Sequence, residues 1–103
     1  MGKNAAVKTL GKIIGNIVLH KMLANYTNKP ESISHLVNEE IEYRTAALID
    51  AKKYNWNETD KQRIAIIAIN FFKNKSFKKY PDVKLPLEEA KTLIHQEITG
   101  LEL

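Results

Sequence analysis

The chain has 103 residues, 44% of them hydrophobic and 27% charged, with 16 Lys and Arg, 12 Asp and Glu and no cysteine. This length supports a single hydrophobic core and excludes a two-domain enzyme, and the apolar fraction excludes a wholly disordered chain. Without cysteine there is no disulfide, thiolate metal site or cysteine nucleophile, and we expect a reducing, cytoplasmic location. Lys12, Asn16 and Lys21 interrupt the apolar residues near the N-terminus, so we expect neither a signal sequence nor a membrane span.

The first predicted helix covers residues 4–25, where apolar residues recur with helical spacing on one face. Leu19 and Leu23 lie on its otherwise polar side, so this half needs cover from a second direction, and both are candidate contacts for a partner. Gly11 and Gly15 either let another helix approach closely or are small residues at the margin of the packing face. We favour the second interpretation.

The second predicted helix covers residues 31–54 and carries a long apolar stripe. Glu40 and Arg44 lie four residues apart at the centre of this stripe. A buried charge needs a partner, so we predict a structural ion pair between them, or with polar groups of a neighbouring helix, rather than a catalytic acid. Ile49 points to the opposite side and is a third candidate partner contact.

Four potential metal ligands also share one face of the second predicted helix: Glu31, His35, Glu39 and Glu42. Metal sites in helical bundles draw ligands from facing helices into the core, and this face points away from the apolar side. We therefore expect a solvated acidic surface, with no metal and no cofactor.

The third predicted helix covers residues 58–78, with Asn57 or Thr59 as its N-cap, and its centre at 64–72 is apolar almost all round. A fourth covers 86–99, with Pro86 in its first turn and Gly100 at its end. We predict an all-α fold in which residues 1–103 form one compact four-helix domain. The strongly apolar third helix is predicted to be central and enclosed by the other three.

Residues 73–85 form the one strongly biased segment, with five lysines and one acid. This local excess equals the net charge of +4, so the rest of the chain is balanced. Lysines neutralise phosphates, and aromatic rings stack on unpaired bases. The segment therefore predicts a basic loop that binds nucleic acid, RNA or DNA, through Lys73, Lys75, Phe77, Lys78, Lys79, Tyr80 and Lys84.

A second interpretation of this segment stays open. Lysines gather at helix C-termini because the helix dipole favours cations there, and Phe77 then belongs to the core. Lys8 and Lys12 extend the basic surface only if the first helix lies near the segment.

No catalytic residue is predicted, because the sequence has no Gly-x-Ser-x-Gly elbow, P-loop or dinucleotide-binding glycine motif. We expect a protein that is not an enzyme. Two functions remain: binding of nucleic acid through the lysine-rich segment, or a helical protein-interaction module or homodimer that does not bind nucleic acid. No motif identifies a known family.

Overall fold

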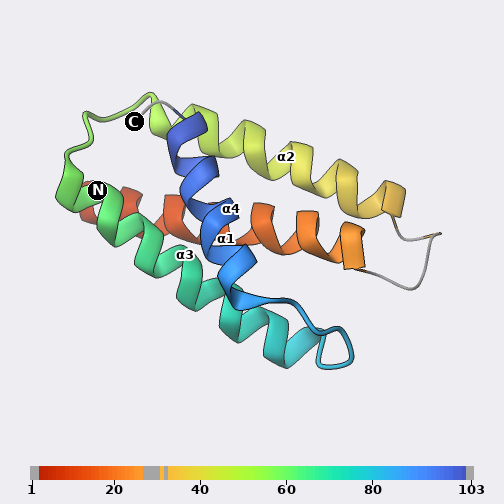
Figure 1. Cartoon of the computed structure of the whole chain (residues 1–103). Helices are drawn as coiled ribbons and strands as arrows, with labels where there is room; N and C mark the ends of the chain where they lie inside the picture. The colour runs from red at the N-terminus through yellow and green to blue at the C-terminus, as the bar shows by residue number, and fades with distance from the viewer. Residues whose placement is uncertain (1–2, 27–30, 32, 102–103) are drawn as a thin grey trace.

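The computed structural model describes residues 3–26, 31 and 33–101 and forms an all-α domain of four helices. The helices are α1 (Lys3–Tyr26), α2 (Ile33–Ala51), α3 (Glu58–Lys79) and α4 (Leu87–Gly100). In Figure 1, α1 lies between α2 and α3, and α4 crosses over α1 on one face of this layer. The predicted all-α, four-helix fold class is confirmed. None of the described helices is both long enough and apolar enough to cross a membrane.

The central helix is α1, whereas the sequence pattern placed the third helix at the centre. Most of the fully buried side chains come from α1: Val7, Leu10, Ile14, Ile17, Val18, Leu19 and Met22. In contrast, α3 keeps an outer face in solvent, on which Ile66 is 59% exposed and Phe77 81% exposed. An apolar run shows that a helix has buried residues, but the packing of its neighbours decides which helix is enclosed.

Leu19 and Leu23 are buried in the core, so they do not form the partner-facing side that the sequence pattern indicated. Because α1 lies between two helices and is crossed by a third, its second side is covered within the chain itself. Ile49 of α2 is 57% exposed and remains accessible.

The two glycines of α1 allow α3 to pack unusually close. A Cβ atom added at Gly11 would lie 2.6 Å from the Cγ2 atom of Ile67, and one added at Gly15 would lie 2.8 Å from the carbonyl oxygen of Ala68. Neither distance is compatible with a real side chain. Gly11 and Gly15 therefore permit close helix approach, which is the interpretation we had considered weaker.

Polar contacts fix the first turn of α3. The Asn57 side chain accepts a hydrogen bond from the Asp60 backbone at 2.8 Å, and the Asp60 carboxylate accepts one from the Asn57 backbone at 3.1 Å, which completes a capping box. Lys3 contacts the same carboxylate at 2.5 Å, and Arg63 donates to the Asn4 side chain at 3.0 Å. The start of α3 is thus tied to the start of α1, and the two helices run parallel.

Helix α2 buries few side chains, and polar contacts join it to a neighbouring helix. Its buried residues are Leu36, Ala47 and Ala51. Arg44 holds Glu97 of α4 through two hydrogen bonds, at 2.5 and 3.3 Å, and reaches Glu40 at 3.4 Å. The predicted pair of Glu40 and Arg44 is therefore part of a three-residue network that joins α2 to α4.

Candidate nucleic-acid interface

The lysine-rich segment is partly helical, because α3 continues to Lys79. The expected loop at 73–85 is therefore the last two turns of α3 followed by the connection to α4. We call six of these side chains the basic end of α3: Lys73, Phe77, Lys78, Lys79, Tyr80 and Lys84. Placing most of them on a helix fixes their directions, so Lys73 and Phe77, four residues apart, share the outer face.

The four lysines of the basic end are exposed and lack acidic partners. No carboxylate among the described residues lies within 4.0 Å of Lys73, Lys78, Lys79 or Lys84. Elsewhere, lysines pair with acids three residues earlier, as Lys53, Lys61 and Lys91 do at 3.3 to 3.5 Å. The positive charge of the basic end is therefore available to an external anion.

Lys75 differs from its neighbours because it faces α1. Its ammonium donates to the Asn16 side chain at 2.6 Å and lies 5.6 Å from the centre of the Phe71 ring. Burial lowers the pKa of Lys75, the positive charge of Lys79 lowers it further, and Glu39 opposes both effects. We therefore remove Lys75 from the residues that present charge to a ligand.

Phe77 is the most exposed large apolar side chain among the described residues, at 81%. This excludes the interpretation in which Phe77 belongs to the core. Tyr80, at the C-cap of α3, is half-buried, and its backbone N–H donates to the Ser76 carbonyl at 3.0 Å. The two aromatic rings therefore differ in role, since Phe77 stands in solvent and Tyr80 forms part of a wall.

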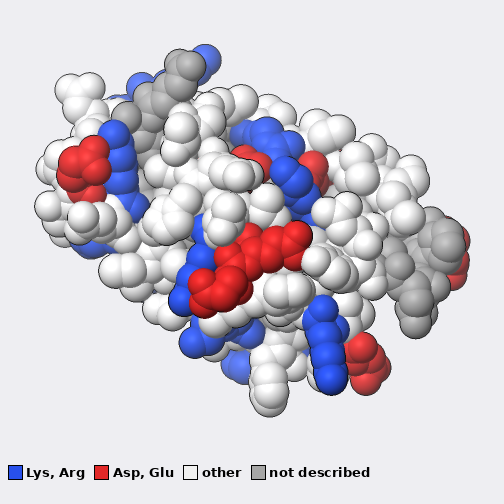
Figure 2. Space-filling view, in the orientation of Figure 1, with Lys and Arg blue, Asp and Glu red and all other residues white. Residues whose placement is uncertain are grey.

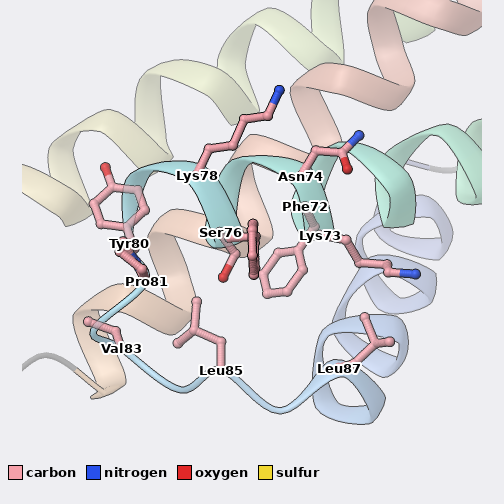
Figure 3. A pocket seen from close by; sticks show the side chains of 11 residues that line it. Phe72, Lys73, Asn74, Ser76, Lys78, Tyr80, Pro81, Val83, Leu85 and Leu87 are labelled. Carbon is pink, nitrogen blue, oxygen red and sulfur yellow. The ribbon is translucent and has the colours of Figure 1, made fainter.

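That wall belongs to a pocket of about 420 Å³ between the end of α3, the connection and the start of α4 (Figure 3). Its apolar lining includes Phe72, Tyr80, Val83, Leu85 and Leu87. The side chains of Lys73 and Lys78 extend outward from α3, with their ammonium groups on separate sides of it. The pocket thus has an apolar interior, with Lys73 near it, while the Lys78 ammonium extends from the side of α3 away from the connection.

Lys8 and Lys12 are exposed on α1. Because α2 and α3 flank α1 and α4 crosses its front, these lysines lie on the face opposite α4. Asn16 follows Lys12 by four residues and binds Lys75, so this row of polar side chains leads toward the end of α3. The first helix therefore does lie beside the lysine-rich segment, on that opposite face.

The face that carries α4 is different in character. Figure 2 shows acidic and basic side chains beside one another over much of this face, with basic ones along its lower edge over α3 and a largely uncharged area over one half of α2. Four exposed apolar residues share one face of α2, and we call them the α2 stripe: Ile33, Val37, Ile41 and Leu48.

One buried polar contact between α1 and α2 is not predictable from the sequence pattern. His20, only 3% exposed, donates from Nδ1 to the Asn16 carbonyl at 2.8 Å, and its Nε2 meets the Glu39 carboxylate of α2. The other oxygen of Glu39 lies 2.9 Å from His35. The carboxylate of Glu39 thus bridges His20 of α1 and His35 of α2. No sequence pattern relates residues this far apart.

Across residues 3–26, 31 and 33–101, no three His, Asp or Glu side chains are grouped so that they could hold a metal ion. Comparison with protein families, with curated proteins and with solved structures finds no match for this chain. No relative therefore assigns a function to the basic end.

Proposed function

We propose that this chain is a small binding protein without a catalytic role, which holds RNA or DNA at the basic end of α3. The observation that carries the proposal is Phe77, an aromatic ring 81% exposed among four lysines that have no acidic partner in the described part of the chain. We place this activity in the cytoplasm, which suits a chain without cysteine.

The helix dipole alone does not account for this arrangement. A cation in the last turn of a helix contributes about 0.3–1 kcal/mol, which is a sufficient reason for Lys78 and Lys79. It gives no reason for an exposed ring at Phe77, since burying a phenylalanine stabilises a fold by about 1.5–3 kcal/mol. Lys84 lies beyond the helix, where the dipole has little effect. A ligand with both phosphates and bases uses all of these groups.

Each group has a defined task in this proposal. The ammonium groups neutralise phosphates and release the counterions that surround them, which makes binding strongly dependent on salt. Phe77 stacks on an unpaired base, an interaction worth about 1–3 kcal/mol for each base. Single strands and loops expose base faces, so they fit the basic end better than a continuous duplex does.

The direct test measures the affinity for a labelled single-stranded oligonucleotide by fluorescence anisotropy over a range of salt concentrations. Changing Lys73, Lys78 and Lys79 together to glutamine should lower the slope of log K against log salt by about 2, since each lost phosphate contact on a single strand removes about 0.7.

A matched control changes Lys53, Lys61 and Lys91 to glutamine. It removes the same charge from lysines that already have acidic partners, and the slope should stay close to that of the unchanged protein. Absence of binding at low salt, or equal slopes in the two triple variants, would exclude the proposal.

The α2 stripe favours a second candidate function, a helical interaction module or homodimer. Its residues Ile33, Val37, Ile41 and Leu48 follow one another at intervals of four, four and seven, so they share one face of α2, and each is 39–54% exposed. Exposed apolar residues in a continuous row often mark a protein contact. Ile49 lies on another side of the same helix.

Sedimentation at high protein concentration tests this second function. A homodimer should dissociate when Ile41 is changed to glutamate, whereas the same change at Ile66, an isolated exposed residue of α3, should have no effect. A protein that stays monomeric at millimolar concentration and retains no partner would contradict it.

A further inference from the structure

Backbone hydrogen bonds and a proline shape one wall of the pocket beside the basic end. The Tyr80 N–H donates to the Ser76 carbonyl at 3.0 Å, and the Val83 N–H donates to the Tyr80 carbonyl at 3.2 Å, so the chain turns sharply after α3. The segment then continues to Pro86, whose ψ of 121° is extended. Leu85, the residue before Pro86, is also restricted to extended geometry. Val83 and Leu85 are therefore held at the side of the pocket.

The lining defines the kind of ligand that fits. Phe72, Tyr80, Val83, Leu85 and Leu87 offer an apolar and aromatic interior, while Lys73 and Lys78 provide positive charge on separate sides of α3 (Figure 3). The volume of about 420 Å³ lies at the lower end of the range for small-molecule sites, which begins near 300 Å³. A ligand with a flat ring and with negatively charged groups attached on more than one side of that ring satisfies this arrangement.

Charge complementarity distinguishes two classes of ligand for this pocket, an apolar acid and a nucleic-acid strand. An apolar acid, such as a fatty acid, has one carboxylate and uses one ammonium group. Here Lys73 and Lys78 line the pocket, and Lys79 and Lys84 stand nearby in sequence, all without acidic partners among the described residues. A chain of phosphates on both sides of one ring uses several of them at once.

We propose that this pocket receives one unpaired base of a single-stranded nucleic acid, while Lys73 and the other lysines of the basic end contact the phosphates of the same strand. The inference rests on the proposed function and adds the place where a base is held. Phe77, which also lines the pocket, stacks on that base or its neighbour. A paired base is not accessible in this way, so the pocket selects single strands over duplex.

The test compares two oligomers of equal length at the same salt concentration, one with bases and one with an abasic backbone that keeps every phosphate. The unchanged protein should bind the oligomer with bases about 5- to 150-fold more tightly, which corresponds to the stacking of one base. A duplex of the same sequence should bind about as weakly as the abasic oligomer.

Filling the pocket should abolish this preference without changing the lysines. Ser76 lines the pocket, and changing Ser76 to phenylalanine places a ring inside it. The two affinities should then become equal, with that of the abasic oligomer unchanged. Leu85→Ser opens the wall and should reduce the preference independently of Ser76→Phe. Leu93→Ser is the matched control, because Leu93 is also partly buried against the core but does not line the pocket.

The outcomes separate the two proposals. Equal affinity of the unchanged protein for both oligomers, with salt-dependent binding retained, overturns the base pocket and leaves nucleic-acid binding in place. Binding of dodecanoate without any preference for bases overturns it as well and identifies a site for apolar anions. Failure to bind either oligomer at low salt rejects the proposed function together with the pocket.

Discussion

The two ends of α3 differ in how their charges are satisfied. At the N-terminal end, Asp60 completes a capping box with Asn57 and pairs with Lys3, and Arg63 binds Asn4. At the C-terminal end, the lysines of the basic end have no acidic partner among the described residues, and Phe77 stands in solvent.

This difference separates the residues that stabilise the fold from those available for binding. The first end and the α1-facing side hold the helices together through caps, ion pairs and close packing at Gly11 and Gly15. In the basic end only Tyr80 packs against the core, and the other five side chains are exposed. Substitutions should therefore lower stability at the first end and along the α1-facing side, and lower ligand affinity at the second end.

The largest expected contrast is between two phenylalanines five residues apart. Phe72 is 2% exposed, so Phe72→Ala should lower the free energy of unfolding by about 3–5 kcal/mol. Phe77→Ala should change it by less than about 0.5 kcal/mol and should weaken binding of single strands instead. Urea unfolding followed by circular dichroism measures both, and similar destabilisation by the two variants would show that Phe77 also supports the fold.

A smaller effect is expected where α1 and α3 pack closely. A methyl group at Gly15 meets backbone at 2.8 Å, so Gly15→Ala should destabilise the protein by about 1–3 kcal/mol through overpacking, less the roughly 0.5–1 kcal/mol that alanine contributes in a helix. The control is Gly100→Ala, because a Cβ there has no neighbour within 4 Å. A rise in the melting temperature of Gly15→Ala would contradict this packing.

The smallest expected effect concerns pH. The hydrogen bond from Lys3, followed by that from the Asn57 backbone, lowers the pKa of Asp60 below its ordinary value of 3.8. A carboxyl group with a lowered pKa stabilises the folded state at pH values above the unfolded pKa, and this contribution is lost as the pH falls through the folded pKa. Asp60→Asn should therefore reduce stability at neutral pH and flatten the decline in stability as the pH falls below 3.8. An unchanged acid profile would show that the contact with Lys3 has no effect on stability.

The fold class follows from the sequence because helical periodicity and helix-ending residues are local properties. The spacing of apolar residues from Val7 to Val18 predicts a helix, and Asn57 was one of two N-caps expected for the third helix. The position of α1 at the centre depends on Gly11 and Gly15 meeting Ile67 and Ala68, which are distant in sequence. Periodicity contains no information about such pairs.

The candidate nucleic-acid interface also depends on contacts between helices that the sequence pattern does not reveal. Five lysines and two aromatic residues mark the region, but composition does not distinguish Lys75, which binds Asn16, from Lys73, which faces outward. That distinction depends on the direction of each side chain relative to α1. His20 and Glu39 were missed for the same reason, because their contact joins two helices.

The most direct test of the account locates the ligand on the protein. In a two-dimensional ¹⁵N–¹H NMR spectrum of the labelled protein, addition of a short single-stranded oligonucleotide should shift the backbone amides of residues 73–87. The amides of the first turns of α3 and of the α2 stripe should remain unchanged. Shifts concentrated at residues 33–48, or no shifts at low salt, would contradict the assignment of nucleic-acid binding to the basic end.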